Sequence, residues 1–252
     1  VSQLIGCVVL VIILFTKIEK PAVFRMLIPF PLKQFGTMLK VGIPSAAETF
    51  LYNLSQLVIT SIVLNFLTEN ELIAKTYVQS ITMLFYLCSL AIGQASQIMI
   101  GHLVGAGRYD EACRQGYRSH RTALLLMAAV CGVGVLLREP LIGLFTDNPE
   151  IISIGSEIIL MNCILELGRT TNLVMIASMR GAGDVYFPTA CAIFSNWLLS
   201  VLGSYLFAVV FGMGIYGLWI ALAADECVRG VLMLLRWKNG RWRTKRLMRS
   251  DT

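Results

Sequence analysis

Residues 151–188 read IISIGSEIILMNCILELGRTTNLVMIASMRGAGDVYFP, an apolar run with Glu166 and Arg169 near its middle and a glycine-rich, basic end. About 20 helical residues, each rising 1.5 Å, cross the hydrocarbon core of a bilayer. We therefore predict a transmembrane helix here, because the run is longer than one crossing requires. An ionisable side chain at mid-depth costs roughly 2.5 to 3.5 kcal/mol, so the acid and the base require either a pairing or a functional explanation.

The composition of the chain is that of an integral membrane protein. Of its 252 residues, 56% are hydrophobic and 14% are charged, and the mean hydropathy is +0.72. Soluble domains carry about 25% charged residues. The net charge of +6 lies in short loops and a tail, which argues against nucleic acid and for membrane lipid as a partner. The seven cysteines are scattered without a CxxC pair, so we predict reduced packing residues with no disulfide or transition-metal site.

The sequence predicts seven apolar spans, which we expect to be helices separated by proline-rich and glycine-rich connections. The chain opens inside an apolar run with no basic segment before it, so we expect a fragment without its N-terminal part. The expected spans are Val1–Thr16, Val41–Leu67, Thr76–Ile100, Arg121–Leu137, Ile151–Ser178, Thr189–Phe211 and Gly214–Leu235.

The distribution of Lys and Arg predicts the orientation of these spans. Seventeen of the 21 basic residues fall on one side when the connections are assigned alternately. Cytoplasmic loops carry such an excess, so the C-terminus is expected to be cytoplasmic and the protein to be a multi-pass protein of the plasma (inner) membrane.

The second span has a polar face formed by Glu48, Tyr52, Ser55 and Gln56, which recur at helical spacing. Such a face must contact protein or water. Glu48 is interpreted either as a carboxylate that binds a proton or a cation, or as a structural group bonded to backbone or hydroxyl groups. In the third span, Gln94 and Gln97 are the candidate polar groups, because a buried amide requires hydrogen-bond partners.

Ionisable residues in the fifth and seventh spans lie close enough in sequence to pair within one helix. Glu166 and Arg169 are separated by three residues, so pairing is the preferred interpretation, and proton or ion exchange by Glu166 is the alternative. In the seventh span, Arg229 can neutralise only one of Asp225 and Glu226, and this group is predicted to be structural. Ser195 and Asn196 in the sixth span are expected to supply interhelical hydrogen bonds.

Catalytic motifs are missing from the sequence. The two histidines, His102 and His120, have no metal-ligand spacing, and no Walker sequence is present. We therefore predict that the protein is not an enzyme and uses no cofactor, with energy supplied by an ion gradient.

Several segments together resemble the C-terminal half of the multidrug and toxic compound extrusion (MATE) transporters. They are SQIMIGHLVGAGRYDEA (residues 96–112), MRGAGDVYFP (179–188), GIPSAAE (42–48) and the last span with Trp219, Asp225 and Arg229. The resemblance implies an all-α membrane fold with twelve helices in two six-helix lobes. It divides the chain into 1–16, the end of the last N-terminal-lobe helix; 17–40, a cytoplasmic inter-lobe linker; 41–236, the C-terminal six-helix lobe; and 237–252, a basic cytoplasmic tail.

The resemblance implies a secondary active antiporter that exports amphipathic, cationic compounds in exchange for sodium ions or protons. Its partners would be small-molecule substrates, membrane lipid and the missing lobe of the same chain, and the complete protein would be monomeric. Some members bind the cation through acids of the helices that correspond to the second and fifth spans, which here offer Glu48 and Glu166 for sodium. Arg169 occupies the position where the family's fifth-span acid is expected, which argues against sodium at this site.

The candidate ion or substrate residues are Glu48, Tyr52, Gln56, Gln94, Gln97, Glu166, Arg169 and Asn196. Two alternatives stay open. A related flippase for lipid-linked sugars would need a cleft rich in Arg and Lys to hold phosphates. A membrane scaffold that transports nothing would tolerate neutralisation of Glu48 and Glu166.

Overall fold

The computed structural model describes residues 2–13 and 32–244, and these residues are almost entirely helical. The helices have the following bounds: α1 Ser2–Ile13, α2 Leu32–Phe66, α3 Glu69–Gly105, α4 Tyr109–Leu136, α5 Arg138–Gly143, α6 Pro149–Gly181, α7 Tyr186–Ser195, η3 Asn196–Leu202, η4 Tyr205–Val210, α8 Gly214–Lys238 and η5 Arg241–Thr244. The chain divides into two compact units, residues 1–45 and 46–252, which are described separately.

The first unit contains α1 and the first turns of α2. The helix α1 has 12 residues, and the apolar side chains described along it are exposed. The 12 described residues of α1 rise about 18 Å.

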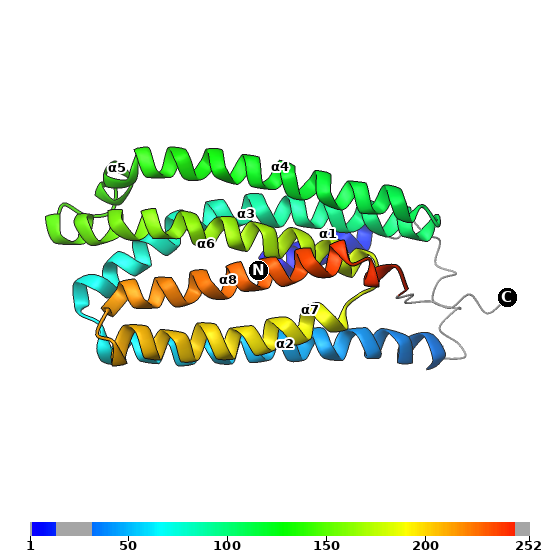
Figure 1. The fold of residues 1–252 in the computed structure, drawn as a ribbon, viewed down its shortest axis with the longest axis horizontal. Helices are drawn as coiled ribbons and strands as arrows, with labels where there is room; N and C mark the ends of the chain where they lie inside the picture. The colour runs from blue at the N-terminus through cyan, green and yellow to red at the C-terminus, as the bar shows by residue number, and fades with distance from the viewer. Residues whose placement is uncertain (1, 14–31, 245–252) are drawn as a thin grey trace. The chain divides into compact units, whose positions relative to one another are not determined.

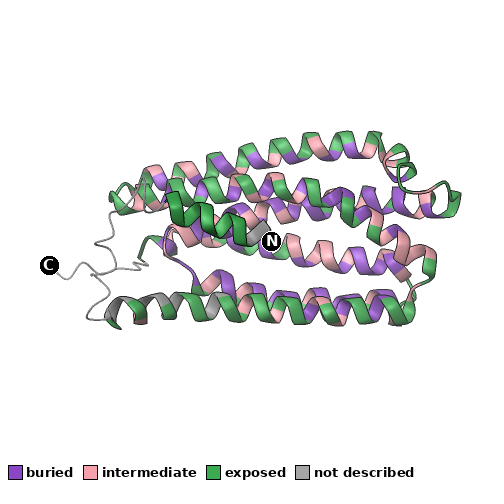
Figure 2. Cartoon of the chain, turned by 180° about the vertical axis from the view of Figure 1, so that it is seen from behind, coloured by how far each residue is buried: buried purple, intermediate pink, exposed green. Residues whose placement is uncertain are grey.

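The second unit is a bundle of long helices whose axes run roughly side by side (Figure 1). Its central element is α6, which packs against α3, α4 and α8, and α8 also packs against the rod formed by α7, η3 and η4. In Figure 2, exposed residues follow the outer faces of the helices. Within residues 2–13 and 32–244, five helices are long and apolar enough to cross a membrane: residues 46–66, α3, α4, α6 and the rod 186–210. The all-α, multi-pass membrane fold expected from the sequence is therefore confirmed.

The helix α8 differs from these five spans. Its 25 residues are enough for a crossing, but Asp225, Glu226 and Arg229 interrupt its apolar stretch. Its burial explains how it tolerates them, because Asp225 and Arg229 are 2% and 8% exposed.

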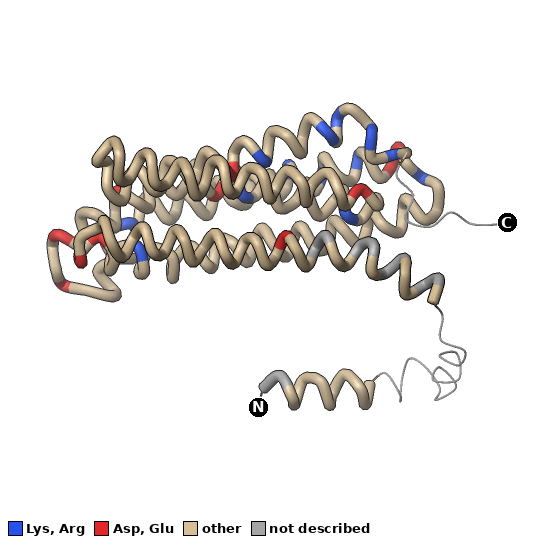
Figure 3. The backbone as a smooth tube through the Cα atoms, turned by 90° about the horizontal axis from the view of Figure 1, so that it is seen from below, with Lys and Arg blue, Asp and Glu red and all other residues tan. Residues whose placement is uncertain are grey.

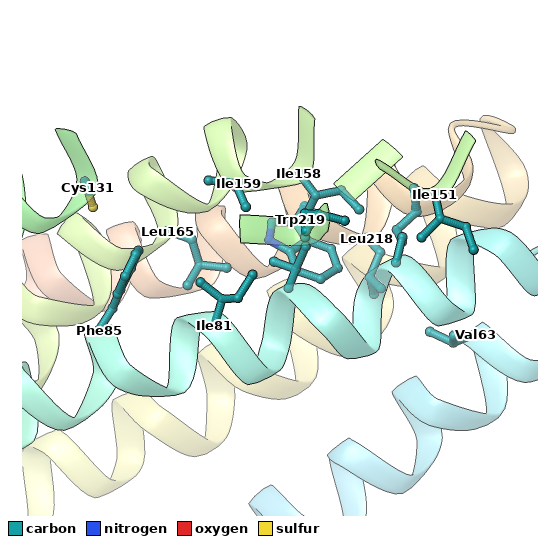
Figure 4. Packing of buried hydrophobic residues seen from close by; sticks show 14 of the residues in the cluster. Val63, Ile81, Phe85, Cys131, Ile151, Ile158, Ile159, Leu165, Leu218 and Trp219 are labelled. Atoms are coloured by element: carbon teal, nitrogen blue, oxygen red, sulfur yellow. The ribbon is translucent and has the colours of Figure 1, made fainter. Parts of the chain in front are cut away.

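The main core of the second unit joins α3, α6 and α8. In Figure 4, Trp219 of α8 lies among Ile158 and Leu165 of α6 and Ile81 of α3. A second cluster at the other end of the bundle stacks Trp237 on Trp242, with ring centroids 4.3 Å apart. Residue 242 belongs to the segment assigned to a basic tail, so that tail begins with a buried anchor.

Several helix boundaries differ from the sequence prediction. Helices α2, α3 and α4 begin at Leu32, Glu69 and Tyr109, earlier than the apolar spans, and residues 32–40 of the expected linker are helical. Hydropathy locates only the apolar part of a helix, whereas hydrogen bonding extends it to a cap, such as the capping box that Thr68 forms with Glu71 before α3. The remaining linker residues 17–31 and tail residues 245–252 lie outside the described residues.

Two local features were also unexpected. The connection before α6 contains the short helix α5, and the sixth span is wound with i→i+5 hydrogen bonding over most of its second half. Pi-helical turns inside α-helices are frequent at functional sites. Glycine turns follow α3 and α6, where Gly107 and Gly183 have φ angles of 74° and 92°.

Candidate functional site

A cavity of about 600 Å³ opens within the second unit, between α2, α3, α6, α8 and the rod that begins with α7. Its wall includes aromatic and thioether side chains that suit an apolar ligand: Tyr52, Met83, Tyr86 and Trp219. It also includes charged groups from three helices: Glu48, Arg169, Arg180, Glu226 and Arg229. Clefts of a few hundred to 1,000 Å³ are the usual size for small-molecule sites.

One face of α6 lines the cavity. Asn162, Arg169, Ile176 and Arg180 all line the cavity, and they recur at spacings of seven, seven and four residues. Such spacing aligns side chains along one side of a helix. Glu166 lies on the same side and is fully buried.

Glu166 and Arg169 pair as the sequence predicts, and the pair extends to α8. Arg169 Nη1 lies 2.6 Å from Glu166 Oε1, and Arg169 Nε lies 3.5 Å from Glu226 Oε1. Arg229 Nη2 lies 3.1 Å from Glu226 Oε1 and 2.7 Å from Asp225 Oδ2. We call these five residues the α6–α8 charge network. Arg229 alone could neutralise only one of Asp225 and Glu226. In the structure Glu226 also pairs with Arg169.

Hydroxyl and amide groups from neighbouring helices complete the network. Ser195 Oγ donates to Asp225 Oδ1, and Ser200 Oγ donates to Asp225 Oδ2 at 2.8 Å. Asn172 Nδ2 donates to Glu226 Oε2 at 2.9 Å. The expected hydrogen bond from Asn196 is also present, because Asn196 Nδ2 donates to Ser55 Oγ of α2. Asp225 thus ties α8 to the π-wound rod.

A close approach of α6 and α8 allows these side chains to meet. A Cβ atom on Gly168 would lie 2.7 Å from Cys227 Sγ and 2.9 Å from the Cys227 backbone nitrogen. Only glycine fits at that distance from backbone atoms. Gly168 directly precedes Arg169, so this contact sets the separation of the paired charges.

Glu48 forms a separate cluster at the cavity wall. Arg180 Nη2 lies 2.6 Å from Glu48 Oε2, and Thr189 Oγ1 donates to the same oxygen at 2.7 Å. The hydroxyl contact fits the structural interpretation of Glu48, but its main partner is a guanidinium. The cluster joins α2 to the end of α6 and the start of α7, and it includes no member of the α6–α8 charge network.

Buried polar atoms without hydrogen-bond partners gather around the cavity. Among the described side chains, Asn162 Nδ2, Glu166 Oε2, Asn172 Oδ1, Arg180 Nε and Arg229 Nε have none. An unsatisfied buried polar atom costs about 1 to 3 kcal/mol. Buried polar groups are normally hydrogen-bonded, so these atoms are positioned to bind water, an ion or a ligand in the cavity.

The structure brings together only part of the predicted set. Glu48, Tyr52, Arg169 and Asn196 line the cavity, and Glu166 lies behind the wall. Gln56 is half-buried outside the lining, and Gln94 and Gln97 are exposed on α3. The α3 amide at the cavity is instead Gln79.

Sequence reasoning missed Arg180, Thr189, Asn172, Asn162 and Ser200. Arg180 was assigned to a connection, but it lies in the last turn of α6. The sequence spacing could have identified Arg180, because residue 180 lies 14 positions after Glu166 and continues the same helical face.

A cation could contact Glu48 or Glu166 only in competition with a guanidinium, since each carboxylate is already paired with its own arginine. Within the described ranges, no three His, Cys, Asp or Glu side chains converge in an arrangement that could hold a metal ion.

Sequence comparisons identify related proteins. A family model described as MatE matches residues 44–206. The uncharacterized transporter YisQ of Bacillus subtilis (strain 168) is 37% identical over 242 residues, covering 96% of this chain and 53% of that protein. A probable multidrug resistance protein NorM of Thermotoga maritima is 25% identical, covering 98% of this chain and 53% of that protein. The chain thus spans about half the length of the curated relatives that it matches.

Solved structures show the same fold. The Vibrio cholerae MATE transporter VcmN in its bent form superimposes with a TM-score of 0.75 at 19% identity, covering 82% of this chain and 47% of that one. A MOP superfamily transporter from Pyrococcus furiosus gives a TM-score of 0.72 at 16% identity, covering 78% of this chain and 43% of that one. At these identities the likeness establishes the fold alone.

Proposed function

Because the chain belongs to the MatE family of membrane transporters, we propose that it forms one lobe of a secondary active antiporter that exports amphipathic, cationic compounds. The exchanged ion is a proton or sodium. The transporter functions as a monomer in the plasma (inner) membrane, with this lobe's C-terminus in the cytoplasm.

The observation that carries this proposal is the balance of charge at the cavity. Four carboxylates, those of Glu48, Glu166, Asp225 and Glu226, are paired with three guanidiniums, those of Arg169, Arg180 and Arg229. One negative charge is therefore in excess when all are ionised. In a site of low dielectric constant an uncompensated charge is costly, so the cavity attracts one cation.

Competition for that charge would produce antiport. A proton or sodium ion neutralises the excess carboxylate in one state, and the cationic group of a substrate neutralises it in the other. The aromatic faces of Tyr52, Tyr86 and Trp219 in the cavity wall suit the apolar part of such a substrate and also attract cations. Polar groups at mid-depth between helices are the usual binding sites of secondary transporters.

Efflux of a lipophilic cationic dye tests the proposal. The gene that encodes the chain would be expressed in cells without their own pumps, with the sodium and proton gradients collapsed one at a time. The test variant is Glu48→Gln plus Glu166→Gln. The charge-matched control is Glu150→Gln plus Glu157→Gln, because both residues lie on α6, outside the cavity lining.

Gradient-dependent efflux that is lost in the test variant and kept in the control supports the proposal. Efflux that persists in the test variant contradicts coupling by these acids, although transport itself would stand. Efflux that is unchanged when either gradient is collapsed contradicts secondary transport.

One observation favours a second candidate, a flippase for lipid-linked sugars or another large amphiphile. Arg180 adds a third guanidinium to a cavity where the sequence indicated two. All three arginines are already engaged by carboxylates, however, which weakens the attraction for phosphate. Dye retention by well-expressed protein, together with gradient-dependent movement of a phospholipid-linked sugar, would favour this candidate. A scaffold would show neither activity.

A further inference from the structure

A stripe of arginines on α4 lies away from the cavity. Arg114, Arg118 and Arg121 are separated by four and three residues, so they share one face of the helix, and all three are exposed. Tyr117, which is 40% exposed, lies between them. They belong to the basic end of the second unit, whereas acidic residues predominate at the opposite end (Figure 3).

Among the described residues, these three arginines form no ion pair, whereas three other arginines at the same end do. At the same end, Arg108 pairs with Glu111 at 2.5 Å, Arg236 with Asp184 at 2.9 Å and Arg243 with Asp110 at 3.0 Å. Among the described residues, no carboxylate lies within 4.0 Å of the guanidiniums of the stripe. Their guanidiniums are therefore available to bind an anion from outside this part of the chain.

The length of α4 indicates where the stripe lies in a bilayer. The charge-free part of the helix runs from Thr122 to Leu136, which is 15 residues. These residues rise about 22 Å, less than the hydrocarbon thickness of about 30 Å. The turns just before Thr122, which carry Arg118 and Arg121, can supply the missing length. Long arginine side chains at that depth reach outward to the headgroups.

The same face continues as an apolar surface. Leu125, four residues after Arg121, is 67% exposed, and Leu136, near the end of α4, is 83% exposed. A partner that covers this face needs an anionic group next to the arginines and an apolar body below them. An anionic phospholipid has both parts in that order, and guanidinium binds phosphate through paired hydrogen bonds.

We propose that Arg114, Arg118 and Arg121 bind the headgroup phosphates of anionic lipids at the membrane surface. This site is independent of the cavity and of the proposed transport activity. It holds lipid along α4 and fixes the depth of that helix in the bilayer.

Lipid retention measured by native mass spectrometry tests this proposal. The product of the gene that encodes the chain would be purified in detergent and equilibrated with equal amounts of phosphatidylglycerol and phosphatidylcholine. The test variant is Arg118→Gln plus Arg121→Gln. The charge-matched control is Lys238→Gln plus Arg241→Gln, since both residues are exposed at the same end and lie outside the stripe.

Each arginine near an anionic surface contributes about a fivefold preference, so the test variant should lose about 25-fold in phosphatidylglycerol preference. The control should retain the wild-type preference. A third variant, Arg118→Lys plus Arg121→Lys, keeps the charges and should retain most of it, which separates lipid binding from misfolding. Unchanged preference in the glutamine variant, or equal losses in variant and control, would overturn the proposal.

Discussion

Arg169→Met is the substitution that probes the α6–α8 charge network most specifically. Methionine preserves much of the apolar length of the side chain but removes the guanidinium that lies 2.6 Å from Glu166. Glu226 keeps Arg229 at 3.1 Å and Asn172 at 2.9 Å, so the loss falls mainly on Glu166. Glu166 is fully buried, and its Oε2 atom has no hydrogen-bond partner among the described residues.

The size of the effect can be worked out from two limits. Removing one partner of a buried ion pair costs about 3 to 5 kcal/mol. The folded variant can instead protonate Glu166, and protonating a carboxyl group of ordinary pKa at pH 7 costs about 3.7 kcal/mol. We therefore expect a loss of about 3 to 4 kcal/mol at pH 7, or roughly 10 °C in Tm.

The loss should depend on pH with a defined sign. In the variant, folded protein carries a proton on Glu166 that unfolded protein releases at pH 7, so its stability rises as pH falls. At pH 5 the cost of protonation is only about 1 kcal/mol. Thermal unfolding of the purified protein, followed by tryptophan fluorescence at both pH values, measures the difference between variant and wild type.

A second substitution checks the cause. Adding Glu166→Gln to Arg169→Met removes the unpaired charge and should restore most of the stability. If the double variant is as unstable as Arg169→Met, or if the loss is the same at pH 5 and pH 7, the charge argument fails and Arg169 acts through packing alone.

The remaining predictions concern packing between helices. Gly168→Ala forces a Cβ atom against the Cys227 backbone and should destabilise the protein by about 1 to 3 kcal/mol, measured by thermal unfolding. Gly132→Ala is the control, because its added Cβ atom meets nothing within 4 Å. It should leave the Tm unchanged or raise it slightly. Equal effects of the two glycine substitutions would contradict a close α6–α8 contact. Trp242→Ala removes a buried ring stacked on Trp237 and should cost about 3 to 5 kcal/mol. A Tm shift of less than 2 °C would show that residues 241–244 are not anchored.

The fold was predictable from the sequence because apolar length is a strong signal. The run 151–188 is long enough to require a bilayer, and α6 is indeed the central helix of its unit. Helix ends were less predictable, since α4 begins at Tyr109 in a polar segment where only its backbone hydrogen bonds define it. The π-winding after Ser195 leaves no periodic signature in hydropathy.

The site was predictable within helices but only partly between them. The spacing of Glu166 to Arg169 and of Asp225 to Arg229 fixes those pairs locally. The contacts of Arg169 with Glu226 depend on how closely α6 and α8 approach, which spacing along one helix cannot reveal. Gln94 and Gln97 were chosen because buried amides need partners, but the helix turns them outward in the described structure.

The measurement that tests the central claim most directly is the number of cations released when a substrate binds. Purified protein would be titrated with a lipophilic cationic dye, with proton release followed by calorimetry in two buffers of different ionisation enthalpy and sodium release by a sodium electrode. The excess carboxylate at the cavity predicts the release of one cation for each dye bound, and no release from Glu48→Gln plus Glu166→Gln. Dye binding by the wild type with no proton and no sodium released would contradict the account.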